Sequence, residues 1–297
     1  MRLRVDRYEA FLIIASFVWG TSFAASKIAL DHVDPYYLGL TRFVVGAELL
    51  LLVALILGRF DLKIFKDPII WLIGLLNAFG QFFQNVGMTQ TTATNTVLLV
   101  DINVVFVALI ASVVLKEALT RYTFYGLGLG LIGVIIISTG GDFKEVMDSN
   151  FIGNLIVFLA GVIWAFYIVY QKKSIAKHGD VFMTSAGAIA TTAIFGVPIG
   201  LFLAGSTSID IDGAISILYL AGVCTAGAFL FYIAGLKGKG ATDSSIILLL
   251  EIVFGMMFAF ILISEVPTLF TAIGGVFIVA AIMVISIQTN GAKKNSG

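Results

Sequence analysis

Charged residues are scarce in this chain. They make up 12% of its 297 residues, and 18 acidic side chains balance 18 basic ones. Soluble domains carry about 25% charged residues, so the composition excludes a water-soluble globule. The zero net charge argues against nucleic acid as a partner. The single cysteine, Cys224, excludes an internal disulfide and falls short of a thiolate metal site. We therefore expect neither a metal nor a cofactor.

Hydrophobic residues dominate instead, at 59% of the chain, and the mean hydropathy is +1.04. A helix needs about 20 apolar residues to cross a bilayer. Ten runs have that length, at 8–29, 35–57, 69–88, 92–115, 121–140, 151–172, 180–204, 214–236, 241–263 and 267–288. Runs such as 127–138 are apolar on every side, which excludes transmembrane strands of alternating polarity. The sequence predicts an all-α membrane protein with ten transmembrane helices.

The basic residues predict how these helices are oriented. With the N-terminus in the cytoplasm, the outer loops hold only Lys27 and Lys144, and the remaining loop lysines and arginines are internal. Loops rich in Lys and Arg stay on the cytoplasmic side. We expect a multi-pass protein of the cell membrane with both termini in the cytoplasm.

Similar residues recur at a fixed distance, which indicates an internal repeat. At an offset of 145 the pairs are Trp19 with Trp164 and Lys27 with Lys172; at 148 they include Phe106 with Phe254, Glu117 with Glu265, Thr120 with Thr268, and Gly126 with Gly274. The alternative is chance coincidence in a chain of few residue types. Because each half has five spans, the second enters the membrane upside down. We expect two inverted five-helix repeats, 1–145 and 146–297, an architecture common in secondary transporters.

The same residues resemble a known family. The segment from Trp19 to Lys27, followed by Pro35 and Arg42-Phe43, is similar to the start of the EamA family within the drug/metabolite transporter superfamily, and the segments 115–120 and 264–268 resemble the close of each half. The resemblance implies a ten-helix transporter of amino acids, drugs or other small metabolites with a central cavity. It does not extend to a proline often found after the glutamate of the ninth helix, because Ile252 follows Glu251 here.

Ionisable residues deep in a span are costly and mark functional sites. Glu251 lies in the middle of an apolar stretch and is a candidate to carry a coupling proton; the alternative is a structural glutamate. Asp101 either faces the cavity or pairs with Arg42. Asn103 lies about 200° from Asp101 on an ideal helix, so only one of the two is expected to face the cavity squarely.

Uncharged polar and aromatic residues supply further candidates. Asn77, Gln81, Gln84 and Asn85 share one helix face, where they either line a solute path or join helices. Two tryptophans and a tyrosine either stack on a solute or simply pack. The candidate substrate-binding residues are Trp19, Arg42, Asn77, Gln81, Gln84, Asp101, Asn103, Trp164, Tyr167 and Glu251, with Glu251 and Asp101 as candidates for coupling.

We predict a secondary transporter that moves a small organic metabolite by alternating access. The alternatives are a channel-like facilitator and an intramembrane protein that transports nothing. The chain has no Walker-type nucleotide motif, and without His-Glu-x-x-His or Gly-x-Ser-x-Gly motifs it is not expected to be an enzyme. The expected partners are a small-molecule solute and the lipid bilayer. Glycines such as Gly126, Gly133 and Gly274 predict close packing between the fifth and tenth helices or a homodimer contact.

Overall fold

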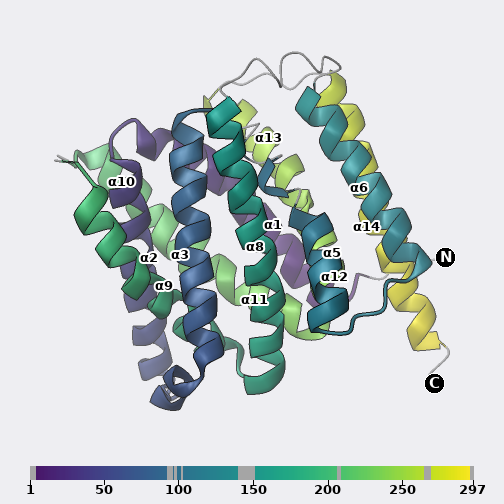
Figure 1. The fold of residues 1–297 in the computed structure, drawn as a ribbon, viewed down its shortest axis with the longest axis horizontal. Coiled ribbons are helices and arrows are strands. Elements are labelled where there is room, and N and C mark those ends of the chain that lie inside the picture. The colour runs from purple at the N-terminus through teal and green to yellow at the C-terminus, as the bar shows by residue number, and fades with distance from the viewer. Residues whose placement is uncertain are drawn as a thin grey trace.

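The computed structural model describes residues 5–91, 96, 99–101, 103–139, 151–205, 209–263 and 269–294. Within those ranges every regular element is helical (Figure 1), as predicted. In chain order the elements are α1 (Arg7–Leu30), α2 (Pro35–Ile56), the 3₁₀-helix η1 (Leu62–Lys66), α3 (Pro68–Thr89), α5 (Asn103–Val114), α6 (Arg121–Thr139), α8 (Phe151–His178), α9 (Val181–Leu203), α10 (Ile211–Tyr219), the π-helix η2 (Leu220–Gly227), α11 (Ala228–Gly238), α12 (Ala241–Leu248), α13 (Leu250–Ile263) and α14 (Leu269–Lys294).

Most of these helices have the length and composition of membrane spans. Among the described residues, seven helical segments are long and apolar enough to cross a bilayer, and two shorter apolar ones are Leu99–Val114 and Ala272–Ala281. Large apolar side chains on the outside, among them Leu55, Val113 and Phe202, are exposed. A soluble protein could not keep so large an apolar exterior in water. The chain is therefore a multi-pass membrane protein.

Aspartate residues set where many helices begin. Asp6, Asp34, Asp67, Asp180 and Asp210 each accept a hydrogen bond from a backbone N–H in the first turn of the following helix. Such caps satisfy donors that have no partner inside the helix. In two cases proline follows at the first helical position, where its missing N–H costs nothing.

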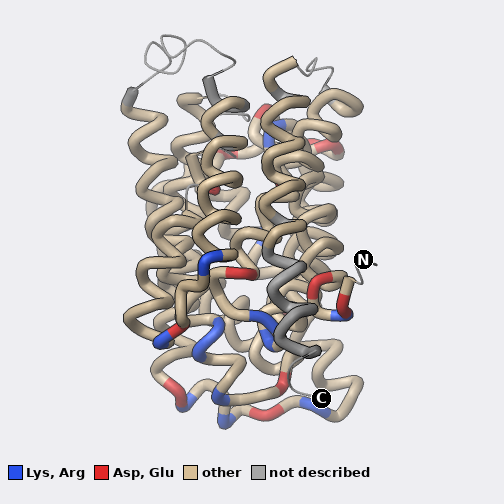
Figure 2. Tube along the Cα trace, turned by 90° about the vertical axis from the view of Figure 1, so that its right-hand side faces the viewer, with Lys and Arg blue, Asp and Glu red and all other residues tan. Residues whose placement is uncertain are grey.

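Of the two ends of the bundle, one holds most of the charged residues (Figure 2). We call it the basic end; it holds the segments 59–67, 172–180 and 237–241, which Lys177 and Lys237 join through contacts to Asp67 and the Gly179 carbonyl. The opposite end holds the α1–α2 and α9–α10 connections, where His32 contacts Asp210. This difference in charge between the two ends is the asymmetry from which the orientation of the helices was predicted.

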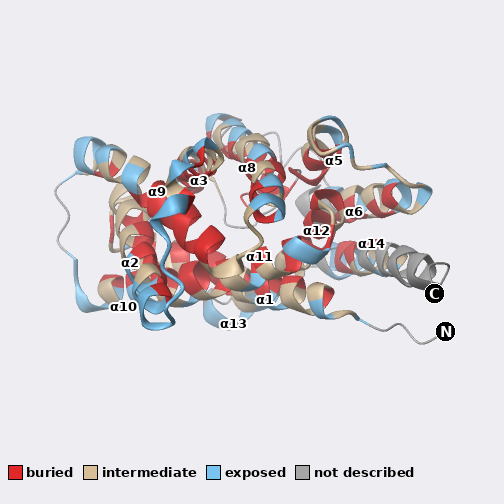
Figure 3. Cartoon of the chain, turned by 90° about the horizontal axis from the view of Figure 1, so that it is seen from below, coloured by how far each residue is buried: buried red, intermediate tan, exposed pale blue. Residues whose placement is uncertain are grey.

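Helices distant in sequence pack side by side. α6 lies along α14 at one edge of the bundle (Figures 1 and 3), and α1 packs against α11 and α13, α3 against α8 and α9, and α2 against α9 and η2. Each of these pairs joins a helix before residue 140 to one after residue 150. The predicted packing of the small-residue helices is present, because a Cβ added to Gly133 would lie 2.7 Å from the Gly274 carbonyl oxygen. Glu265 and Thr268 lie outside the described residues.

Candidate functional site

A cavity of about 80 Å³, large enough for several water molecules, lies within the bundle. It is bordered by side chains from α1, α2, α3, α8, α11, α12, α13 and the chain at and before the start of α5. The lining residues are Trp19, Ser22, Phe23, Arg42, Gln81, Gln84, Val100, Asp101, Asn103, Trp164, Tyr167, Ile168, Phe229, Tyr232, Ser245, Leu248 and Glu251. Helices before residue 140 and after residue 150 contribute in nearly equal measure.

Nine of the ten candidate residues border this cavity, and Asn77 is the exception. The Asn77 side chain is fully buried and its Nδ2 donates to Thr192 Oγ1 at 2.9 Å, which joins α3 to α9. The amide side chains of α3 therefore have different roles, because some of them join helices and others line the cavity. Gln81 and Gln84 face the cavity, whereas Asn85 accepts from Gln81 at 2.7 Å and donates to the Pro35 carbonyl at 3.3 Å.

Asp101 and Asn103 both line the cavity, although only one was expected to face it. The expectation assumed one regular helix through residue 102, which lies outside the described residues, and α5 begins at Asn103. Asp101 is buried and its Oδ2 has no hydrogen-bond partner among the described residues. The carboxylate of Glu251 borders the same space from α13.

Arg42 brings a positive charge to this space from α2. Its guanidinium is buried, and Nε donates to Thr225 Oγ1 at 2.8 Å. In the part of the chain that the structure describes, no carboxylate lies within 4.0 Å of Arg42, so of the two alternatives for Asp101 the pairing with Arg42 is not present there. Buried charges are usually paired. Arg42 can therefore bind a solute carboxylate.

An aromatic layer borders the cavity. Tyr167 stands edge-on to Trp164 with ring centroids 5.2 Å apart, and Trp19 lies 5.2 Å from Tyr232. Both indole N–H groups are occupied, by the Cys224 carbonyl at 2.9 Å and by Gln84 Oε1 at 3.2 Å. The indoles therefore offer their ring faces to a solute, while packing against one another as well.

The π-helix η2 positions two of these side chains from outside the cavity. It presents the Cys224 carbonyl to Trp19 and the Thr225 hydroxyl to Arg42. π-Helical turns are rare and frequently occur at functional sites. The sequence analysis missed this element, because an apolar stretch such as 220–227 carries no visible signal for it.

Sequence analysis also missed several lining residues that the repeat could have supplied. At an offset of 145, Trp19, Ser22 and Phe23 correspond to Trp164, Tyr167 and Ile168; at 148, Gln81, Gln84, Val100 and Asn103 correspond to Phe229, Tyr232, Leu248 and Glu251. All seven pairs border the cavity. Transferring each candidate to its counterpart would have found Phe229 and Tyr232.

The fold and the cavity define a helical membrane protein with a polar site between its helices, and comparison with known proteins identifies the family. The family model described as "EamA-like transporter family" matches residues 7–139 and again 151–287. The chain belongs to this family of transporters, and its relatives are named as transporters rather than enzymes, as predicted. Such a protein has the lipid bilayer and a small-molecule solute as partners.

Individual relatives span nearly the whole chain. An uncharacterized transporter of Archaeoglobus fulgidus is 29% identical, over 93% of this chain and 96% of its own length, and the uncharacterized transporter YdfC of Bacillus subtilis is 28% identical, over 93% and 90%. A protein of Streptantibioticus cattleyicolor named "Probable terminal-alkyne amino-acid exporter" is 24% identical, over 96% and 95%. A solved crystal structure superposes with a TM-score of 0.79 at 18% identity, covering 96% of this chain and 98% of its own, which shows a shared fold.

Proposed function

We propose that this protein is a secondary transporter that moves a small organic solute by alternating access. Its ten transmembrane helices would form two inverted repeats, 1–145 and 146–297. The observation that carries the proposal is the cavity, which residues at equivalent positions of the two halves border together. A site shared by two inverted halves can open to either side when the halves exchange conformations.

Two further observations support the repeat. The family model matches the chain twice, once in each half. The contacts between helices are also repeated in the two halves. The repeat offset relates the α1–α13 contact to the α8–α5 contact, and the α1–α11 contact to the α8–α3 contact. An odd number of crossings in each half requires the inversion. The basic end would face the cytoplasm, with both termini there.

The chemistry of the cavity fits a zwitterion such as an amino acid. Arg42 offers a positive charge to a carboxylate, and Asp101 and Glu251 offer carboxylates to an amine. The aromatic layer supplies an apolar wall for a side chain. The name of the relative from Streptantibioticus cattleyicolor points to the same class of solute. Glu251, together with Asp101, would carry the coupling proton.

Uptake into proteoliposomes tests the proposal. A panel of labelled amino acids is offered to the purified wild-type protein and to the Glu251→Gln variant, with and without an imposed pH gradient. We expect saturable uptake, stimulated by unlabelled solute on the far side, which a channel does not show. We expect the gradient to drive the wild type and not the variant. Equal, gradient-independent flux in both would remove Glu251 from coupling, and flux without counterflow would favour a channel.

A further inference from the structure

A buried polar stripe continues from the cavity along α8 toward the basic end. Tyr167, Gln171, Ser174 and His178 follow one another at spacings of four, three and four residues, which places them on one helix face. Tyr167 borders the cavity, and His178 is the last residue of the helix. Eleven residues of helix separate the two, or about 16 Å. The stripe therefore bridges the distance from the cavity to the surface of the basic end.

Three of its side chains, those of Tyr167, Gln171 and Ser174, are buried without hydrogen bonds among the described residues. Gln171 and Ser174 are completely inaccessible, and neither amide atom of Gln171 nor the Ser174 hydroxyl has a partner among the described residues. The hydroxyls of Tyr167 and Tyr232 are likewise unpaired there. An unsatisfied buried polar group lowers the stability of the folded state, and such groups are few in native proteins.

Asn85 of α3 shows what a purely structural amide looks like. Gln81 donates to Asn85, and Asn85 donates to the Pro35 carbonyl. A stripe that served only to pack α8 would be apolar or would have such partners. Unpaired amide and hydroxyl groups instead suit a surface that water and a polar solute contact in another conformation of the protein.

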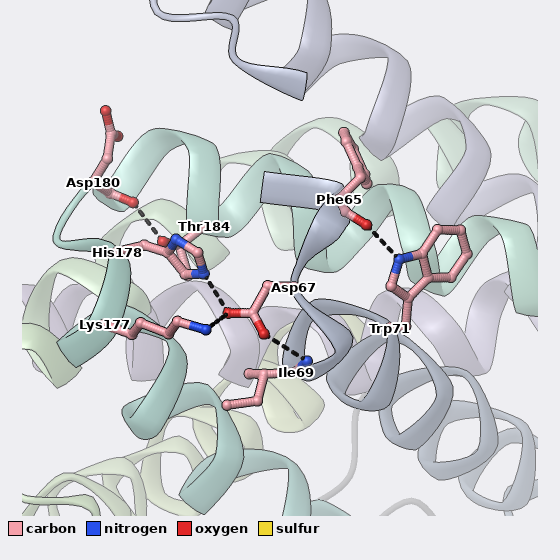
Figure 4. Close-up of polar contacts among 8 residues, drawn as sticks. All are labelled: Phe65, Asp67, Ile69, Trp71, Lys177, His178, Asp180 and Thr184. Atoms are coloured by element: carbon pink, nitrogen blue, oxygen red, sulfur yellow. Dashed lines mark hydrogen bonds and ion pairs between the residues drawn. The ribbon is translucent and has the colours of Figure 1, made fainter. Parts of the chain in front are cut away.

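The stripe ends at a cluster of charges formed around Asp67 (Figure 4). Asp67 Oδ2 accepts from Lys177 Nζ and from His178 Nε2, both at 2.8 Å, while Oδ1 accepts from the Ile69 backbone N–H at 3.0 Å. Asp67 is buried although Lys177 is exposed. We call Asp67, Lys177 and His178 the Asp67 latch. It joins the start of α3 to the end of α8.

Two other contacts close the same end between segments before residue 140 and after residue 150. Lys239 Nζ lies 2.7 Å from Glu9 Oε1, and both side chains are buried. Glu117 Oε1 accepts from the Ala241 backbone N–H at 2.7 Å, at the start of α12. At the opposite end, the His32–Asp210 pair is exposed. Among the described residues, the ion pairs with a buried member therefore lie at the basic end.

We propose that the α8 stripe of Tyr167, Gln171 and Ser174 is the section of the solute path between the cavity and the basic end, and that the Asp67 latch holds this section closed. The inference rests on the proposed transport function, which supplies the second conformation. When the latch opens, the unpaired amide and hydroxyl groups of the stripe form hydrogen bonds with water and then with the polar groups of the solute. Ser22, the counterpart of Tyr167, already borders the cavity on α1.

Thiol labelling tests this proposal without knowledge of the solute. Cys224 is the only cysteine, so Cys224→Ala gives a background without thiols. Gln171→Cys and Ser174→Cys place a thiol on the stripe. Val169→Cys is the control, because Val169 is equally buried but lies about 200° from Gln171 around α8. Each variant is treated with a charged methanethiosulfonate reagent, in inside-out membrane vesicles and in intact cells, with the latch present or weakened by Asp67→Asn.

We expect both stripe thiols to react in inside-out vesicles, and Asp67→Asn to accelerate the reaction at least about tenfold by favouring the open state. The Val169→Cys control is expected to stay unreactive. Asparagine retains an acceptor for the Ile69 N–H, so the cap of α3 should persist. If Asp67→Asn does not fold, Lys177→Gln weakens the latch from an exposed position. Stripe thiols that react no faster than the control, or that react only from outside the cell, would overturn the proposal.

A flux measurement on the same variants separates this proposal from the transport function. Counterflow by a protein whose stripe thiols never react would refute the path and leave the transporter intact. Reactive stripe thiols in a protein without any flux would refute the transporter and leave a water-filled path. Block of counterflow by reagent bound at Ser174→Cys, but not by reagent treatment of Val169→Cys, would support both.

Discussion

Arg42 is the one basic side chain among the described residues that border the cavity. Its partner is a hydroxyl rather than a carboxylate, so its charge is held in place by Thr225 but is not neutralised by contact. The two carboxylates that share the cavity, Asp101 and Glu251, supply the opposite charge at other parts of the wall. This separation of charges would give the proposed zwitterionic solute one orientation.

Replacement of Arg42 should therefore weaken binding more than it weakens folding. For Arg42→Gln we expect the affinity for the best-bound amino acid of the panel to fall about 10- to 100-fold, because hydrogen bonds to charged groups contribute about 1.5–3 kcal/mol. Isothermal titration of purified protein measures the change. Arg59→Gln, at a position outside the cavity where the guanidinium lies over the Phe182 ring, is the control. Unchanged affinity in Arg42→Gln would contradict the assigned role.

The surroundings of Asp67 predict that the stability of the folded protein depends on pH. Burial alone would raise its pKa, but hydrogen bonds from Lys177, the Ile69 backbone and His178 outweigh that effect and hold the pKa below its ordinary value of 3.8. A carboxylate with a lowered pKa stabilises the folded state fully above its unfolded pKa. That stabilisation is lost as the pH falls through the lower, folded value.

The matched variant for this prediction is Asp67→Asn, which cannot titrate. At pH 5.5 we expect the Tm of the wild type in detergent to exceed that of Asp67→Asn by about 3 °C. Between pH 4 and pH 3 the difference should shrink, because the wild-type carboxylate gains a proton. A difference in Tm that stays constant down to pH 3 would show that the charge of Asp67 contributes nothing.

At the scale of elements, α6 offers two glycines with opposite surroundings. A Cβ at Gly133 would meet the Gly274 carbonyl oxygen of α14 at 2.7 Å, whereas a Cβ at Gly128 would meet nothing within 4 Å. Gly133→Ala should force α6 and α14 apart and destabilise the protein by about 1–3 kcal/mol. Gly128→Ala should leave stability unchanged or raise it by up to about 1 kcal/mol. Thermal unfolding in detergent compares them, and equal Tm values would argue against close packing of these helices.

Glu117 precedes α6 in the chain but stabilises the start of α12, which is far away in the sequence. Its carboxylate accepts from the backbone N–H groups of Ala241 and Thr242, at 2.7 and 3.2 Å, and so caps α12. Glu117→Ala should lower stability by about 1–2 kcal/mol, as for other lost caps. Glu117→Gln, which keeps an acceptor, should lower it less. The order of the Tm values of the three proteins checks this, and a Tm of Glu117→Ala equal to the wild type would refute it.

Helix positions were largely predictable from the sequence, because a span must be apolar for about 20 residues and aspartate or proline often marks its start. Side-chain partners were not. Asn77 and Gln81 share a helix face, yet one bonds Thr192 and the other borders the cavity. Which of the two faces a neighbour depends on where α9 packs. The Asp67 latch was invisible for the same reason, since its members are about 110 positions apart and none carries a motif.

At the scale of the whole molecule, the proposed alternating access would make each end a gate, and closing either gate permanently should stop transport. In the Cys224→Ala background, Asp67→Cys with His178→Cys allows a bifunctional thiol reagent to lock the basic end, and His32→Cys with Asp210→Cys allows it to lock the opposite end. The native side chains at both positions are in contact, so short cross-linkers can span them.

We expect either cross-link to abolish counterflow of the fastest-exchanging amino acid, because a carrier needs both conformations in every cycle. A reducing agent that cleaves the linker should restore the flux. Each single-cysteine variant, treated with the same reagent, controls for modification alone. When the basic end is locked, the solute should still bind and raise the Tm, because the cavity stays accessible from the opposite end. Counterflow that persists in fully cross-linked protein would show that the two halves do not exchange roles.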